Sequence, residues 1–195
     1  MLDVGCGAGR HARALAAAGA RTIGLDLSRA LLARAGEAGV PLVRADMRRL
    51  PIRPGAMDLV VNLFTSFGYF ERDEEHALVI RGMTGCLREG GWLAMDFLNA
   101  DTVRRDLVAN EDQVLTGGRA QITRELRERG RRVIKTIRVP DGRHFVERVR
   151  LFQPEELESM MAAAGLRVCE RYGDYEGGPL RPGAPRAILL GRREN

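Results

Sequence analysis

Alternate glycines near the start of the chain carry the clearest chemical signal in the sequence. In "LDVGCGAGRH", Gly5, Gly7 and Gly9 follow a short apolar run and precede an alanine-rich stretch. A glycine turn between a strand and a helix lets a ligand approach the backbone closely. Dinucleotide-binding turns follow the pattern G-x-G-x-x-G, and Arg10 occupies the place of its third glycine here. The spacing therefore disfavours a nicotinamide dinucleotide.

Two acidic residues stand just after the next two apolar runs. Asp26 closes the run at residues 21–25, where a carboxylate can accept hydrogen bonds from both hydroxyls of a ribose. Asp46 follows the third run and, with the Met47 amide, is placed to meet the edge of an adenine. Each feature alone has a simpler explanation, because glycines form tight turns and Asp caps helices. All of them in this order predict a site for a nucleoside that carries a methionine tail and no pyrophosphate.

The elements that must position these residues alternate along the first hundred residues. Short apolar runs and helical patterns follow one another with short links, which predicts an α/β fold with a parallel sheet covered on both faces. We expect strands at 1–4, 21–25, 40–45, 58–64 and 92–98, and helices at 10–18, 28–38 and 73–87, the last ended by the glycines of "REGG".

The second part of the chain has a different pattern. After a short helix near residues 101–109, three runs rich in β-branched and apolar residues, "AQITREL", "RVIKTIRV" and "HFVERVRLF", are separated by turn signals. They predict a three-stranded antiparallel sheet. A last helix through residue 164 and strands at 166–172 and 187–190 complete the chain. We expect one domain over residues 1–195, with an antiparallel insert at 112–152 over the acceptor side.

Five segments together resemble the class I S-adenosylmethionine-dependent methyltransferases. They are "LDVGCGAGRH", "GLDLS", "ADMRRLP", "DLVVNLFTSFGYF" and "LREGGWLAMDFLN", in that family's order and spacing. The resemblance implies a doubly wound Rossmann-like sheet, mostly parallel with an antiparallel last strand, and S-adenosylmethionine as the cofactor.

The same resemblance implies a role in cofactor binding for ten residues. The backbone at Gly5 and Gly7 would approach the methionine moiety, Gly9 would belong to the same binding turn, and Asp3 would support the amino group through the turn. For the rest, Asp26 would hold the ribose, Leu27 would pack on the adenine, Asp46 and Met47 would read its edge, and Asn62 and Leu63 would meet the amino-acid tail.

Methyl transfer from a sulfonium needs little catalytic machinery from the protein. The cofactor carries the activation, so the protein mostly aligns the acceptor and excludes water, and a general base helps only when the acceptor still holds its proton. His11 and Tyr69 are weak candidates for such a base, because His11 also reads as a surface or capping residue and Tyr69 as a core residue. His76 is expected to face solvent. No metal site is indicated by the residue spacing.

The C-terminal half is similar to small-molecule methyltransferases, including the aminosugar N-methyltransferases. That similarity implies methylation of an N or O atom on a small organic molecule, and a possible homodimer. Residues 119–150 hold eleven Arg or Lys and four Asp or Glu, which raises RNA methylation as an alternative. We expect at most weak, sequence-indifferent binding to nucleic acid, since no RNA-binding motif accompanies the charge.

The remaining features concern membrane association, cellular location and the N-terminus. No apolar run is long enough for a membrane span, and the three cysteines are widely spaced, so we expect a cytoplasmic protein with no membrane association. Met1 stands within the first strand, whereas relatives carry a few tens of residues before it. We therefore expect either a start assigned too late or a missing lid, and the latter keeps a non-enzymatic binding scaffold as an alternative.

Overall fold

A seven-stranded sheet forms the body of the computed structural model, which describes residues 1–36, 39–115 and 118–194. Its strand order is β10-β11-β5-β4-β1-β2-β3. Pairing is parallel from β5 to β3, and β11 is antiparallel to both of its neighbours. These strands are β1 (Leu2–Val4), β2 (Ile23–Asp26), β3 (Leu42–Arg44), β4 (Met57–Asn62), β5 (Leu87–Leu98), β10 (Leu166–Tyr172) and β11 (Arg186–Arg193). The predicted mostly parallel sheet with an antiparallel last strand is confirmed.

In the described ranges, the α-helices between the strands are α1 (Arg10–Ala17), α2 (Arg29–Ala35), α3 (Asp73–Cys86), α4 (Ala100–Asp106) and α5 (Pro154–Ala163). Ser28 caps α2 as its position suggests, since its hydroxyl accepts a hydrogen bond from the Leu31 N–H. The expected end of this helix near Ala38 lies outside the described residues. No helix in the described part of the chain is long and apolar enough to cross a membrane.

The fifth strand is longer than predicted, because the glycines of "REGG" do not end α3. The helix already ends at Cys86, and β5 begins at Leu87. Leu87 pairs with Met57 and Trp92 with Leu59, so the residues between them form an irregularity within the strand. A Cβ on Gly91 would lie 2.9 Å from the Arg88 carbonyl oxygen. Gly91 thus allows this bulge, which local sequence cannot distinguish from a helix stop.

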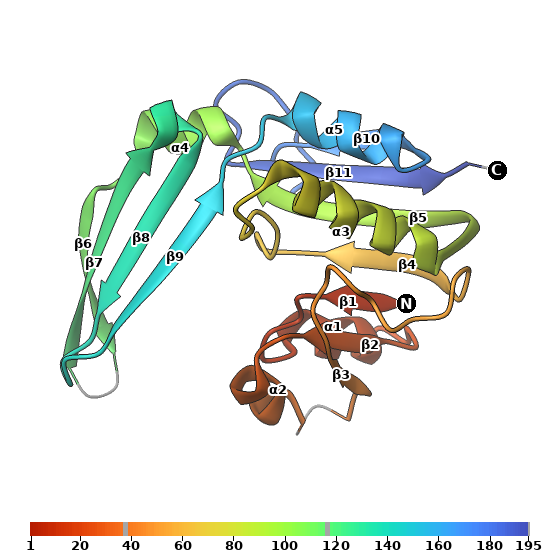
Figure 1. The fold of residues 1–195 in the computed structure, drawn as a ribbon, viewed down its shortest axis with the longest axis horizontal. Helices are drawn as coiled ribbons and strands as arrows, with labels where there is room; N and C mark the ends of the chain where they lie inside the picture. The colour runs from red at the N-terminus through yellow and green to blue at the C-terminus, as the bar shows by residue number, and fades with distance from the viewer. Residues whose placement is uncertain (37–38, 116–117, 195) are drawn as a thin grey trace.

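A second sheet follows α4 and has four strands rather than the three predicted (Figure 1). Its order is β6 (Asn110–Leu115), β7 (Gly118–Arg127), β8 (Arg132–Arg138) and β9 (His144–Arg150), all antiparallel, with a short 3₁₀ turn at Glu128–Gly130. The missed strand β6, "NEDQVL", consists largely of residue types that are depleted in strands. Its pairing with β7, not its own propensity, makes it a strand.

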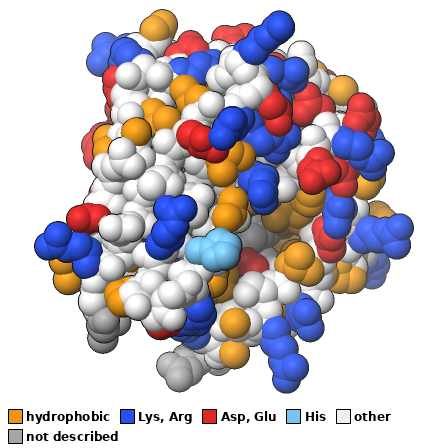
Figure 2. Space-filling view, turned by 60° about the vertical axis from the view of Figure 1, so that its left-hand side comes forward, with side chains coloured by type: hydrophobic (Ala, Val, Ile, Leu, Met, Phe, Trp, Pro, Cys, Tyr) orange, Lys and Arg blue, Asp and Glu red, His pale blue; other side chains and the backbone are white. Residues whose placement is uncertain are grey.

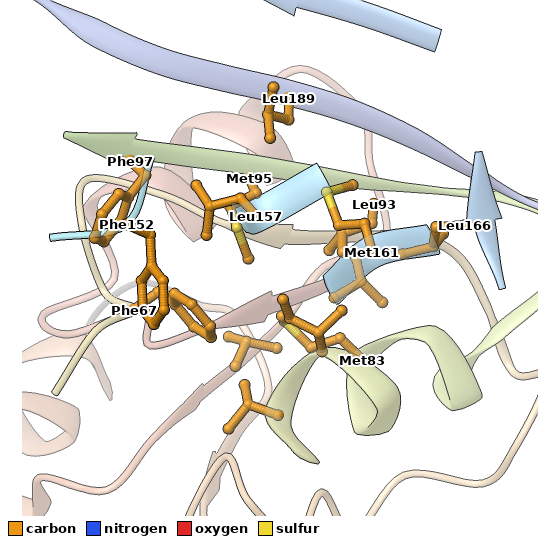
Figure 3. Packing of buried hydrophobic residues seen from close by; sticks show 14 of the residues in the cluster. Phe67, Met83, Leu93, Met95, Phe97, Phe152, Leu157, Met161, Leu166 and Leu189 are labelled. Atoms are coloured by element: carbon orange, nitrogen blue, oxygen red, sulfur yellow. The ribbon is translucent and has the colours of Figure 1, made fainter. Parts of the chain in front are cut away.

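The hydrophobic core lies where α3 and α5 pack together against the sheet. Figure 3 shows Met83 of α3 and Leu157 and Met161 of α5 gathered beside the side chains of β5. Phe67 and Phe152 join the same cluster from the segments after β4 and β9. The core therefore fixes the segment that follows β4 as well as the sheet.

His76 belongs to this core, so its predicted exposure to solvent is wrong. Its ring centroid lies 4.9 Å from that of Phe152 and 5.1 Å from that of Phe67. Nδ1 pairs with the Arg72 carbonyl oxygen at 3.0 Å, and Nε2 accepts a hydrogen bond from the Phe70 N–H at 3.3 Å. Burial lowers the pKa of His76. Both ring nitrogens have partners, which makes burial of the neutral imidazole favourable.

Candidate cofactor and acceptor site

The glycine turn between β1 and α1 has left-handed backbone at all three glycines. The φ angles are +78° at Gly5, +56° at Gly7 and +77° at Gly9. A Cβ on Gly5 would meet the Ser66 Cβ at 2.6 Å, whereas a Cβ on Gly7 would have only the Leu31 side chain within 4 Å, at 3.9 Å. Gly5 therefore allows the turn to pack closely against Ser66, a residue of the same chain. Gly7 is the position at which the turn leaves room for a ligand.

Asp26, at the carboxyl end of β2, reaches the same turn. Its Oδ2 accepts a hydrogen bond from the Gly7 N–H at 2.8 Å, and its Oδ1 accepts one from the Ser28 N–H at 2.8 Å. Each carboxylate oxygen can accept a further hydrogen bond, so Asp26 keeps the capacity for two hydroxyl donors. Leu27 beside it exposes most of its side chain.

Asp3 and Asn62 lie on the neighbouring strands β1 and β4 and are buried with unused acceptors. Asp3 is 1% exposed, and neither its Oδ2 nor the Asn62 Oδ1 has a hydrogen-bond partner among the described residues. The Asn62 amide donates to the Val4 carbonyl oxygen at 2.8 Å. Burial raises the pKa of Asp3 to about 6. An ammonium group, which carries three donors and a positive charge, matches these unused acceptors.

Met47 and Asp46 follow β3 and differ in how they meet the turn. The Met47 Cε would lie 3.6 Å from a Cβ on Gly5, so its side chain reaches the glycine turn. The Asp46 carboxylate instead forms an ion pair with Arg48 at 2.6 Å, which lowers the pKa of Asp46. Arg48 also pairs with Glu75 at 2.7 Å.

The segment after β4 connects this turn to the rest of the sheet edge. The Ser66 hydroxyl is within hydrogen-bond distance of the carbonyl oxygens of Gly5 (3.0 Å) and Leu63 (2.9 Å). Phe64, the next residue along, has a left-handed φ of +55° and is 59% exposed. Its ring centroid lies 6.2 Å from that of His11. Burial and the neighbouring Arg10 lower the pKa of His11.

Asp96 of β5 is the main residue at this edge that the sequence analysis missed. It is 3% exposed, and its carboxylate accepts hydrogen bonds from the Phe64 N–H, the Tyr175 hydroxyl and the Arg186 guanidinium at 2.7–2.9 Å. The available signal was an acid within an otherwise apolar strand, "WLAMDFL". A charge at such a position is rare unless it is paired.

A cavity of about 710 Å³ lies between this edge and the second sheet. Its walls come from the segment after β4, from β5, α4 and β11, and from the insert strands. The lining residues include Phe64, Tyr69, Arg124, Lys135, Glu147 and Arg186. Figure 2 shows hydrophobic side chains within a hollow that has basic and acidic side chains along part of its rim. Tyr69 therefore lines the cavity, which is the position required of a residue that contacts the acceptor. His11 is not among the residues that line the cavity, although its ring lies near that of Phe64, which does line it.

Two ion pairs stand on the insert wall of the cavity. Lys135 of β8 pairs with Glu147 of β9 at 3.2 Å, and Arg124 of β7 pairs with Glu111 of β6 at 2.7 Å. Lys135 is the only lysine in the chain. Burial and the charge of Glu147 raise the pKa of Tyr69, so its hydroxyl keeps its proton at neutral pH and acts as a hydrogen-bond donor.

Known proteins are similar to this chain in sequence and in fold. A methyltransferase domain family matches residues 1–91. The ubiquinone biosynthesis O-methyltransferase of Bordetella bronchiseptica is 33% identical over 106 residues, which are 51% of this chain and 42% of that protein. The matched region thus spans less than half of the length of that relative.

Several solved structures are similar over nearly the whole chain. The CcbJ methyltransferase from Streptomyces caelestis has a TM-score of 0.86 at 22% identity, covering 100% of this chain and 83% of its own. CalS10, an amino pentose methyltransferase from Micromonospora echinaspora solved with S-adenosylmethionine bound, has a TM-score of 0.71 at 26% identity, covering 98% and 82%. Residues 1–91 thus match a methyltransferase domain family, and the whole chain shares its fold with solved methyltransferases.

Proposed function

We propose that the chain transfers the methyl group of S-adenosylmethionine to an N or O atom of a small organic molecule held in the 710 Å³ cavity. One observation carries this proposal. Phe64 contacts the residues that follow the glycine turn and also lines the cavity, so a cofactor at the turn and an acceptor in the cavity would meet at this residue. Such adjacency is what a direct displacement needs.

Each part of the turn supports one part of the cofactor. Gly7 leaves room for close approach, Asp26 offers two acceptors to the ribose, and Leu27 offers an exposed apolar surface to the adenine. Asp3 and Asn62 offer buried acceptors to the ammonium group of the methionine tail. Bound there, the cofactor supplies an activated methyl group on a sulfonium.

Residues of the cavity would align the acceptor and keep water out. Tyr69 would donate a hydrogen bond to an acceptor oxygen, because its raised pKa leaves it protonated. His11, whose pKa is lowered, would be neutral at pH 7 and able to take up a proton. The insert strands would form the wall opposite β5 and α4, as the predicted insert at 112–152 suggests, although residues 116–117 lie outside the described part of the chain.

The basic insert supports a small acceptor better than RNA. Most of its basic side chains pair with acids of the same protein: Arg119, Arg124, Arg127, Arg131, Arg132, Lys135, Arg143 and Arg150. Such pairs neutralise the charge that nucleic-acid binding would use. At most weak binding to nucleic acid, a homodimer and a cytoplasmic location remain predictions from the sequence.

Calorimetry with S-adenosylmethionine and with S-adenosylhomocysteine tests the cofactor site. Asp26→Ala should weaken S-adenosylmethionine binding by about 1–3 kcal/mol, because the ribose hydroxyls lose a charged acceptor. Asp58→Ala is the matched control, since Asp58 is an exposed acid on β4 that pairs only with Arg88 among the described ion pairs. Equal affinity of the Asp26 variant and the native chain would contradict the assigned site.

Labelling of the single lysine can identify the acceptor. Reductive methylation of Lys135, read by mass spectrometry, reports access to the cavity, and the α-amino group is distinguished by its peptide. A true acceptor should protect Lys135 and also take up the labelled methyl group from the cofactor. An acceptor that becomes methylated while Lys135 stays fully reactive would place the reaction outside this cavity.

A further inference from the structure

The backbone at Phe64 is held in a conformation that L-residues rarely adopt. Phe64 and Thr65 have φ angles of +55° and +62°, and neither is glycine. The Phe64 N–H donates to the Asp96 Oδ2 at 2.8 Å, and the Thr65 N–H donates to the Asp96 carbonyl oxygen at 3.1 Å. Strained backbone of this kind persists only where the surrounding structure enforces it. Asp96 therefore enforces the position of the Phe64 ring.

Asp96 is itself fixed from two other segments. The Arg186 guanidinium of β11 donates to the Asp96 Oδ1 at 2.7 Å and to the Thr65 hydroxyl at 3.0 Å. The Tyr175 hydroxyl, from the loop between β10 and β11, donates to Oδ2 at 2.9 Å. The carboxylate is thus anchored on both oxygens.

These hydrogen bonds hold the Phe64 ring in an exposed position, next to a positively charged side chain. Phe64 is 59% exposed, although Phe67 three residues later is fully buried. The Arg10 guanidinium carbon lies 4.5 Å from the Phe64 ring centroid. The face of an aromatic ring is electronegative and attracts a positive charge within about 6 Å. The ring lies where the turn meets the cavity, and it keeps most of its area open with Arg10 in place.

We propose that the Phe64 ring recognises the methylsulfonium of S-adenosylmethionine by a cation–π interaction, and that Asp96 is the residue that positions the ring. The inference rests on the proposed function. In the transfer, the acceptor lone pair forms the new bond to the methyl carbon, and the electrons of the broken C–S bond stay on sulfur. The sulfonium thereby becomes a neutral thioether. The ring then favours the substrate form of the cofactor over its product.

The two forms of the cofactor make this testable without knowledge of the acceptor. S-adenosylmethionine and S-adenosylhomocysteine differ by one methyl group and one positive charge, so the ratio of their dissociation constants reports how the site recognises the methylsulfonium, while contacts common to both ligands cancel. Phe64→Leu should weaken S-adenosylmethionine binding about three- to tenfold and S-adenosylhomocysteine less than about twofold. Phe64→Tyr, which keeps an aromatic face, should preserve the native ratio. Phe145→Leu is the control, because Phe145 is also an exposed phenylalanine near an arginine, on β9.

The positioning role of Asp96 has its own test. Asp96→Asn and the milder Tyr175→Phe should shift the same ratio in the direction of Phe64→Leu, and a variant that is merely unstable would weaken both ligands alike. Equal weakening of both ligands in Phe64→Leu would overturn the proposal and leave Phe64 as a packing residue. Failure of the native chain to bind either ligand would instead contradict the proposed function, so the two failures are distinguishable.

Discussion

At the scale of single residues, Asp3 is expected to favour ligand binding at a cost in the stability of the folded chain. The Asp3 carboxyl group is buried with an unused acceptor, and its pKa in the folded chain, about 6, lies above the ordinary value of 3.8. Between these pH values the unfolded chain loses the proton first, so rising pH favours the unfolded state. The contribution of protonated Asp3 to the free energy of unfolding is fully present below about pH 4 and is lost as the pH rises through about 6.

Asp3→Asn should therefore stabilise the protein at pH 7.5, by about 1–3 kcal/mol, because no charge is then buried. Denaturant unfolding at pH 5 and 7.5 measures the effect, which should be larger at pH 7.5. The same variant should bind S-adenosylmethionine more weakly, since an amide offers no charge to the ammonium group. A variant that is less stable at pH 7.5 than the native chain would show that Asp3 is compensated by a contact beyond those described.

His76 has the opposite dependence on pH. Its pKa is lowered by burial, so the unfolded chain takes up a proton first as the pH falls below about 6.5. The stability contributed by neutral His76 is present above that pH and is lost below it. The test uses an Asp3→Asn background, because the titration of Asp3 has the opposite effect on stability. In that background, the free energy of unfolding should fall as the pH is lowered from 7.5 to 5, and His76→Gln should make this fall smaller. An unchanged pH profile would assign the titration to another group.

At the scale of elements, the glycine turn depends on the segment after β4. Gly5 has no room for a side chain because Ser66 packs against it, and the Ser66 hydroxyl lies within hydrogen-bond distance of the Gly5 carbonyl oxygen. The turn between β1 and α1 and the segment that carries Phe64 are thus one packed unit. A change at either should be felt at both.

Gly5→Ala should destabilise the protein by about 3 kcal/mol, because it combines left-handed backbone with a steric clash. Gly19→Ala is the matched control: its φ is +90°, but nothing lies within 4 Å of the added Cβ, so only the backbone cost of about 1 kcal/mol applies. Thermal unfolding compares the two. Ser66→Gly in the Gly5→Ala background should restore part of the loss, and equal losses at both glycines would remove the clash from the explanation.

At the scale of the whole molecule, Arg150 joins the insert to the body. It is 2% exposed at the end of β9, and its guanidinium pairs with Asp73 of α3 at 3.3 Å and with Glu156 of α5 at 2.7 Å. It also lies over the Phe152 ring at 4.5 Å. One buried cation thus links the insert to both helices of the core.

Arg150→Met should lower the free energy of unfolding by about 2–3 kcal/mol, because Glu156 loses its guanidinium partner and Asp73 keeps only its pair with Arg131. Arg148→Met, an exposed position on the same strand, should change it by less than about 0.5 kcal/mol. Hydrogen exchange should become faster in β8 and β9 of the Arg150 variant. Equal effects of the two substitutions would show that the insert is held by its strand pairing alone.

The sequence by itself determined the proposed cofactor site. The glycine turn, Asp26 and Met47 are each set by a strand and the residues directly after it, and parallel strands bring their carboxyl ends to one edge. Their order along the chain therefore implied their proximity in space. The alternation of strands and helices likewise fixed the main sheet, because each element shows its own period.

Only the tertiary structure decided the proposed acceptor site. Asp96 meets Phe64 and Arg186, which are 32 and 90 residues away in the sequence, through strands that pair without any local signal of it. The burial of His76 depends on three aromatic rings from other segments, and β6 exists because β7 pairs with it. These contacts depend on packing and pairing between distant segments, which the local pattern of the sequence does not record.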